Sequence, residues 1–114
     1  MQEKNDYGMY SGGYIFDQMD RCALSYIRDK SGLSEETVLV TAAVDNLRFK
    51  RQLCDKYNIT IHCDKYEKTE LGNTFYYCYV EVLGNKGEIV AYAYFTFTEA
   101  TNHCIITDVS KQEV

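Results

Sequence analysis

A glycine pair near the start of the chain has the type and spacing of a group that could take part in chemistry. Gly12 and Gly13 stand where a polar loop gives way to a helical pattern. The first-turn amides of a helix are unpaired donors aided by the helix dipole, and glycine lets a ligand approach them closely. Such amides can polarise a carbonyl group. The alternative is that both glycines only permit a tight turn, with Ser11 as the N-cap.

Asp20 is the acidic residue that most needs a structural explanation. It shares a helical stripe with three apolar residues, Phe16, Ala23 and Ile27. A carboxylate on that stripe is expected at a partly buried position. Asp17 serves as an internal control, because Arg21 lies four residues later and explains it as an exposed ion pair. A catalytic carboxylate and a carboxylate held by hydrogen bonds at the helix–sheet boundary are equally consistent with Asp20.

Helix geometry separates these two features. Eight residues at about 1.5 Å each place Gly12 roughly 12 Å from Asp20. One carbonyl cannot easily meet both groups of the same chain. A twofold dimer with antiparallel helices would bring the helix start of one subunit near the Asp20 of the other and create two equivalent sites. If the two features act together, the chain must therefore be a homodimer.

One helix followed by four strands must position these residues. Residues 12–30 carry apolar side chains at three- and four-residue intervals, and Gly32 follows where a helix end is expected. From residue 37 the period changes to two, which predicts strands over 37–50, 57–65, 74–83 and 88–98. In the last strand one face is expected to carry small residues that a helix can approach closely. That face comprises Ile89, Ala91, Ala93, Phe95 and Phe97.

Composition fits a packed α+β domain formed by residues 1–114 as one unit, because 46% of the residues are hydrophobic. The net charge of −5 argues against nonspecific nucleic-acid binding. No stretch approaches the roughly 20 apolar residues of a membrane span, and the polar start lacks a signal-peptide pattern. We therefore expect a cytoplasmic protein with no membrane partner. The five cysteines lack paired spacing, so neither a disulfide framework nor a metal site is predicted.

The segment from Asn5 to Asp20 resembles the helix entry of the hotdog-fold acyl-CoA thioesterases, in the 4-hydroxybenzoyl-CoA thioesterase-like superfamily. That entry commonly reads N-x-x-G-x-x-(F/H)-G-G, with an acidic residue seven positions later. The residues at the corresponding positions are Asn5, Gly8, Ser11, Gly12, Gly13 and Asp20. The similarity continues through 38–49, 72–74 and 91–97. Ser11 departs from the usual Phe or His, and Met9 lies where some members carry a catalytic asparagine.

The resemblance implies a hotdog fold, with one long central helix packed on a curved antiparallel sheet. It also implies a homodimer or a dimer of dimers that hydrolyses an acyl-CoA to the free acid and CoA. Asp20 would act as general base or as nucleophile, while the partner's Gly12 or Gly13 amide polarises the carbonyl. No cofactor is expected, because CoA is part of the substrate.

Further residues receive supporting roles from the same resemblance. Water or substrate would be oriented by Asn5, Gln18 and Thr41. CoA would be contacted by Arg48, Arg51, Gly72 and Thr74. A solvated strand end explains the arginines equally well, and plain structure explains Gln18 and Thr41. The tyrosines expected to shape the acyl pocket are Tyr10, Tyr14 and Tyr26.

Three other functions compete with hydrolysis. A noncatalytic acyl-CoA sensor or carrier could share the fold, because fold does not fix function. A hotdog dehydratase needs a histidine in or near the helix, but His62 lies on a predicted strand and His103 in the tail. A structural dimerisation domain would hold Asp20 as a satisfied boundary residue.

Overall fold

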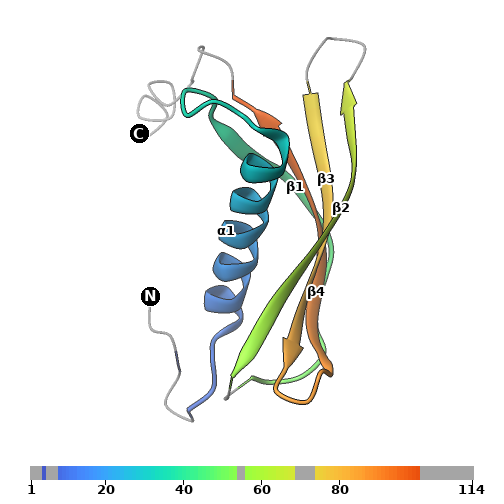
Figure 1. Cartoon of the computed structure of the whole chain (residues 1–114). Coiled ribbons are helices and arrows are strands. Elements are labelled where there is room, and N and C mark those ends of the chain that lie inside the picture. The colour runs from blue at the N-terminus through green and yellow to red at the C-terminus, as the bar shows by residue number, and fades with distance from the viewer. Residues whose placement is uncertain (1–3, 5–7, 54–55, 69–73, 101–114) are drawn as a thin grey trace, which may run out of the picture.

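A computed structural model shows one long helix packed on a single four-stranded sheet (Figure 1). It describes residues 4, 8–53, 56–68 and 74–100, with only the backbone for 64–68. The elements are α1 (Gly12–Ser31), β1 (Leu39–Phe49), β2 (Tyr57–Lys68), β3 (Thr74–Gly84) and β4 (Ile89–Glu99). The predicted helix and four strands are confirmed, and their ends differ from the prediction by at most three residues.

Local sequence determines both ends of α1. The Ser11 hydroxyl accepts a hydrogen bond from the Tyr14 amide at 3.1 Å, which caps the first turn. Gly32 ends the helix in the left-handed conformation with φ 61°, and its amide donates to the Arg28 carbonyl oxygen. The Arg28 guanidinium also donates to the Thr37 carbonyl oxygen at 2.6 Å. The helix end is thereby tied to the loop that leads into β1.

The strand order is β1-β4-β3-β2, and every neighbouring pair is antiparallel. The first two strands in the sequence therefore form the two edges of the sheet. The pairing of β1 with β4 shifts register between Thr41 and Ala43 and again between Asp45 and Arg48, where Asn46 has a φ of 54°. Such irregularities bend and twist a strand. Figure 1 shows the sheet curving along the helix.

The core lies between α1 and the facing side of β3 and β4. The helix contributes its buried stripe of Ile15, Met19, Ala23 and Ile27. The strands contribute Tyr76, Cys78, Val80, Val82, Ala91, Ala93, Phe95 and Phe97. The ring of Phe16 stacks on that of Phe95 with centroids 5.7 Å apart. The predicted two-layer arrangement, with small residues of β4 under the helix, is confirmed.

The first residue of β4 corrects one detail of that prediction. Ile89 is 38% exposed, whereas Val90 is 3% exposed and belongs to the core. The pairing of β3 with β4 shifts register between Val82 and Leu83, opposite this point. The regular alternation along β4 therefore begins only at Ala91.

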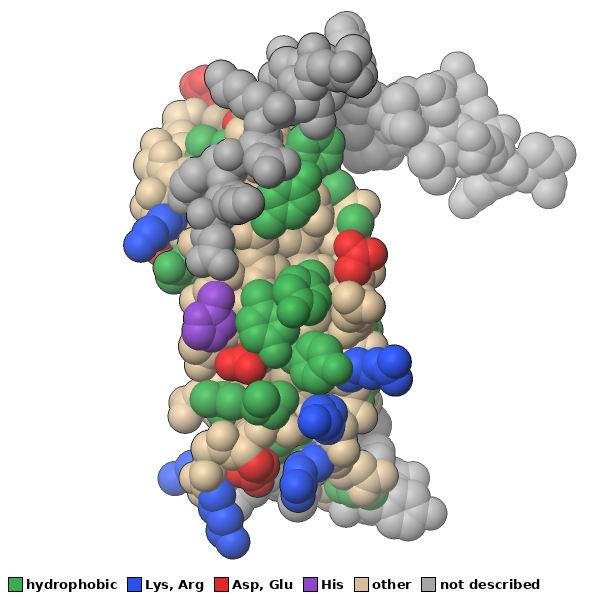
Figure 2. Space-filling view, turned by 90° about the vertical axis from the view of Figure 1, so that its right-hand side faces the viewer, with side chains coloured by type: hydrophobic (Ala, Val, Ile, Leu, Met, Phe, Trp, Pro, Cys, Tyr) green, Lys and Arg blue, Asp and Glu red, His purple; other side chains and the backbone are tan. Residues whose placement is uncertain are grey.

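The other side of the sheet carries four tyrosines on β3 and β4, Tyr77, Tyr79, Tyr92 and Tyr94. Figure 2 looks onto this face and shows hydrophobic side chains along its middle, with charged side chains toward its margins. The rings of Tyr79 and Tyr94 lie 4.7 Å apart, and the Tyr79 hydroxyl donates to Glu81 at 3.0 Å. Burial, followed by this hydrogen bond, raises the pKa of Tyr79 to about 12.

The sequence predicted neither a membrane span nor a metal site. Among the described residues, α1 is the one helix, and no helix there is long and apolar enough to cross a membrane. The same residues contain no group of three His, Cys, Asp or Glu side chains placed to hold a metal ion. The cytoplasmic location stays a prediction from the sequence.

The cap of α1 gives a testable stability difference. Ser11→Ala removes the acceptor for the Tyr14 amide, so the free energy of unfolding should fall by about 1 kcal/mol. Ser25→Ala is the matched control, because Ser25 is exposed inside the same helix and alanine has the higher helix propensity. Urea unfolding of both variants checks this. Equal effects of the two substitutions would show that the cap does not stabilise the fold.

Candidate active site

The free donors at the start of α1 are the amides of Gly12 and Gly13. The Tyr14 amide is taken by the Ser11 hydroxyl, and the Ile15 amide by the Ser11 carbonyl oxygen at 3.1 Å. Both glycines are exposed, and no described residue accepts a hydrogen bond from their amides. The helix dipole adds partial positive charge at the same place. The helix start can therefore receive a carbonyl oxygen or an anion.

A tight turn does not explain the glycine pair. The glycines with positive φ among the described residues are Gly8, Gly32 and Gly87, whereas Gly12 and Gly13 lie inside the helix. A Cβ on Gly12 would meet the Phe49 ring at 3.5 Å, an ordinary contact distance. Glycine in a helix costs about 0.5–1 kcal/mol relative to alanine. Neither backbone conformation nor space thus requires glycine at position 12.

Asp20 accepts a hydrogen bond from the Thr41 hydroxyl at 2.6 Å. Thr41 lies on β1 opposite Phe97, a core residue, so it points to the helix side of the sheet. Asp20 itself is half-buried, as its stripe predicts. The ion pair predicted for Asp17, the internal control, is confirmed, because Arg21 contacts Asp17 at 2.8 Å on the exposed side of the helix. The structure thus brings two predicted site residues, Asp20 and Thr41, into direct contact.

A thiol lies near this carboxylate. Burial, followed by the charges of Cys63 and Asp20, raises the pKa of Cys78 to about 12. A thiol with that pKa is protonated near neutral pH and is not a nucleophile. Cys78 is therefore not a candidate nucleophile beside Asp20.

Within one protomer the glycines and Asp20 stay apart. They belong to one continuous 20-residue helix, and eight residues of helix span about 12 Å. The predicted separation is therefore confirmed. A single protomer does not bring the free amides to the carboxylate.

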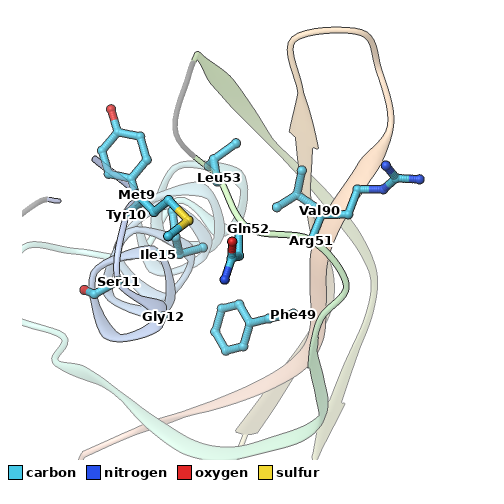
Figure 3. A pocket seen from close by; sticks show the side chains of 10 residues that line it. All are labelled: Met9, Tyr10, Ser11, Gly12, Ile15, Phe49, Arg51, Gln52, Leu53 and Val90. Atoms are coloured by element: carbon cyan, nitrogen blue, oxygen red, sulfur yellow. The ribbon is translucent and has the colours of Figure 1, made fainter. Parts of the chain in front are cut away.

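A cavity of about 240 Å³ opens beside the helix start (Figure 3). Its lining comes from Met9, Tyr10, Ser11, Gly12, Ile15, Phe49, Arg51, Gln52, Leu53 and Val90. The Tyr10 amide donates to the Leu53 carbonyl oxygen at 2.7 Å and joins the two sides of the cavity. Figure 3 shows the Phe49 ring and the Gln52 amide between the helix and the segment after β1, whereas the Arg51 guanidinium points away.

Of the three tyrosines expected to shape the acyl pocket, only Tyr10 lines this cavity. Tyr14 stacks on Tyr10 with ring centroids 5.4 Å apart, and Tyr26 lines a different hollow beside β2. No site role was predicted from the sequence for Phe49 or Gln52. The available signal was a large aromatic residue near the end of a predicted strand.

The remaining predicted residues are spread over the molecule. Arg48 pairs with Tyr92 on the tyrosine side of the sheet, near the helix start, and Arg51 follows β1 at the same end. Thr74 begins β3 at the other end, roughly 20 Å away along the strands. Gln18 is half-buried and has no polar partner among the described residues. Asn5 and Gly72 lie outside those residues, so their roles stay predictions.

Comparison with known proteins gives matches among solved structures. No protein-family model and no curated protein sequence matches the chain. A Bacillus halodurans protein solved with CoA matches with a TM-score of 0.72 and 16% identity, over 89% of this chain and 62% of that one. The chain has the hotdog fold. The predicted hotdog architecture, one long helix on a curved antiparallel sheet, is confirmed.

Two thioesterase structures show the same hotdog fold. A hypothetical thioesterase from Streptococcus pneumoniae, solved with coenzyme A, matches with a TM-score of 0.68 and 23% identity, over 86% of this chain and 70% of that one. A hexameric thioesterase from Yersinia pestis matches with a TM-score of 0.62 and 22% identity, over 88% of this chain and 79% of that one. The predicted resemblance to hotdog thioesterases is thus confirmed in the fold.

Two substitutions at position 12 test whether its glycine is structural. Gly12→Ala should fold and raise the free energy of unfolding by up to about 1 kcal/mol, because the helix gains alanine without a clash. Gly12→Pro should also fold. Proline suits the first helical position, and Ser11 already has the extended backbone that must precede proline (φ −70°, ψ 151°).

Gly32→Ala is the matched control, since its φ of 61° requires glycine. This variant should lose about 1 kcal/mol or more. Urea unfolding of the three variants checks these expectations. A loss of several kcal/mol in Gly12→Ala would show that Gly12 is needed for folding.

Proposed function

We propose that this chain hydrolyses acyl-CoA thioesters to a free acid and CoA at sites shared between two protomers. The observation that carries the proposal is the Asp20 carboxylate, held by Thr41 at 2.6 Å on the helix whose first two amides are free. Hotdog structures similar to this chain include thioesterases, one of them solved with coenzyme A. In thioester hydrolysis a carboxylate can serve as base or nucleophile, and free amides can stabilise the oxyanion.

Thr41 orients the carboxylate of Asp20. Its hydroxyl donates to Oδ1 of Asp20, which fixes the plane of the carboxylate and leaves Oδ2 for the reaction. In one route Oδ2 takes a proton from water, and the resulting hydroxide attacks the thioester carbonyl. In the other route Oδ2 attacks the carbonyl, and water then hydrolyses the mixed anhydride. In both routes the CoA thiolate leaves, and the partner's Gly12 or Gly13 amide stabilises the oxyanion.

The exposed edge of β1 supports a homodimer. β1 pairs with β4 on one side, and no described strand pairs with its other side. Its neighbourhood exposes apolar side chains, with Val38 56%, Val40 41% and Phe49 45% exposed. Unpaired apolar edge strands are sites of association. A twofold axis beside β1 and perpendicular to the sheet would make the helices antiparallel and bring the partner's helix start toward Asp20.

The same symmetry brings together two of the predicted CoA contacts. In one protomer Arg51 lies near the helix start, whereas Thr74 lies at the other end of the sheet. An antiparallel partner puts its Thr74 end level with the Arg51 end of the first protomer. CoA would then be held by side chains of both chains, whereas Arg48 faces the tyrosine side of the sheet. A dimer of dimers is a further assembly that this arrangement leaves open.

A noncatalytic acyl-CoA sensor or carrier is the second candidate. Met9 and Ser11 line the cavity at the helix start, where the thioesterase pattern has residues of other types. A Met9 thioether is at best a weak hydrogen-bond acceptor for water, and the Ser11 hydroxyl is already engaged as the helix cap. The sensor would bind acyl-CoA through the same amides without releasing CoA.

The Asp20→Asn substitution tests whether Asp20 is the base or nucleophile of hydrolysis. The amide preserves shape and can still accept from Thr41, but it cannot act as a base. Hydrolysis should fall by a factor of about 100 or more. Release of free CoA thiol from short, long and aromatic acyl-CoAs is the measurement.

Asp17→Asn is the matched control, because Asp17 forms only an exposed ion pair with Arg21. Its activity should equal that of the wild type. Wild-type activity in Asp20→Asn would exclude Asp20 as base or nucleophile. Binding of acyl-CoA without thiol release by the wild type would establish the sensor.

Mixing two inactive variants tests the shared site. Gly12→Pro and Gly13→Pro each remove one amide donor from the first turn, where proline is tolerated. The less active of the two is unfolded and refolded together with Asp20→Asn. Half of the dimers should be heterodimers with one complete site, so about a quarter of wild-type activity should return. No recovery in a mixture proven to contain heterodimers would place both groups of each site in one chain.

A further inference from the structure

The cavity beside the helix start has an apolar, closed inner end. Ile15, Leu53 and Val90 line it and are each at most 6% exposed. Backbone hydrogen bonds hold this end together, since the amides of Lys50 and Arg51 both donate to the Val90 carbonyl oxygen, at 2.7 and 3.2 Å. A group that enters past Gly12 therefore meets a firm hydrocarbon wall. These three residues suit an aliphatic chain, whereas the Gln52 amide, which lines the same cavity, offers a polar contact.

The size of the cavity restricts what such a chain can be. Its volume is about 240 Å³. That corresponds to about eight water molecules at roughly 30 Å³ each, and sites for drug-sized ligands begin at about 300 Å³. A short acyl group fits within this space, whereas a long fatty acyl chain would extend beyond its opening.

Phe49 forms the wall next to the free amides. Two atoms of its ring, Cε2 and Cζ, lie 3.5 Å from the place that a Cβ on Gly12 would occupy. The ring is 45% exposed, so it stands between the cavity and the outside rather than inside the core. Its backbone position is fixed, because Phe49 pairs with Ala91 of β4. An acyl chain that enters the cavity beside Gly12 would therefore pass this ring, which Figure 3 shows among the lining side chains.

We infer that the cavity is the acyl site and that Phe49 closes its outer side, which makes short aliphatic acyl-CoAs the preferred substrates. This inference rests on the proposed thioesterase function. Phe49 acts as a specificity-determining residue and takes no part in the chemical steps. Removing its ring opens the cavity toward the outside and admits longer chains. Enlarging the side chain has the reverse effect.

Rates with a series of acyl-CoAs test this role. The ratio of kcat/KM for decanoyl-CoA to that for butyryl-CoA is measured in the wild type, Phe49→Ala and Phe49→Trp. Phe49→Ala should raise the ratio at least tenfold, and Phe49→Trp should lower it. Tyr94→Ala is the matched control, because Tyr94 is an aromatic residue of similar exposure, 49%, on the other side of the sheet. Its ratio should equal the wild-type ratio.

Three results would overturn the inference. The first is a wild type that prefers decanoyl-CoA. The second is a Phe49→Ala ratio equal to that of the wild type, including an equal loss with both substrates. The third is a shift of the same size in Tyr94→Ala. Phe49→Trp keeps the test decisive if Phe49→Ala does not fold.

Binding measurements separate this inference from the proposed function. Dissociation constants of butyryl-CoA and decanoyl-CoA are measured by calorimetry with Asp20→Asn and with the Asp20→Asn/Phe49→Ala double variant. A wild type without hydrolysis, combined with a tenfold shift in relative affinity, would refute the enzyme and support the acyl site. Hydrolysis by the wild type without any shift in rate or affinity would support the enzyme and refute the role of Phe49.

Discussion

The packing of α1 on an alanine-containing face of the sheet is the interaction on which the site depends. Ala23 of the helix and Ala91 and Ala93 of β4 are completely buried. Their methyl groups allow the helix to lie close to the sheet, and the larger rings of Phe95 and Phe97 flank them. Burial of the whole stripe of Ile15, Met19, Ala23 and Ile27 against the sheet fixes the rotation of the helix about its axis. Asp20 consequently reaches the boundary with β1, where Thr41 meets it.

The parts predicted from the sequence are those that short-range patterns determine. The apolar period of α1, its Ser11 cap and the left-handed Gly32 are local features, so the helix ends agreed with the structure. The half-buried position of Asp20 followed from the same period. Thr41 was recognised only through its resemblance to a family pattern, since nothing local indicates that it faces Asp20 across 21 residues of sequence.

The parts that were missed depend on contacts between distant segments. Phe49 meets Gly12 although 37 residues separate them, and this contact arises only when β1 joins β4 and the helix packs over both. The inward turn of Val90 depends on a register shift in a neighbouring strand. The glycine pair was ambiguous for another reason, because a sequence does not reveal φ. The structure removes the turn explanation by placing both glycines inside the helix.

The rigidity of one helix links the chemistry to assembly. A loop could fold back to bring its amides to its own carboxylate, but a continuous helix holds them about two turns apart. In the proposed mechanism, a second copy that runs in the opposite direction supplies the missing group to each end. The exposed apolar edge of β1 offers a surface for that copy, and it adjoins Thr41 and Phe49. In this proposal, association, orientation of Asp20 and closure of the acyl cavity depend on the same strand.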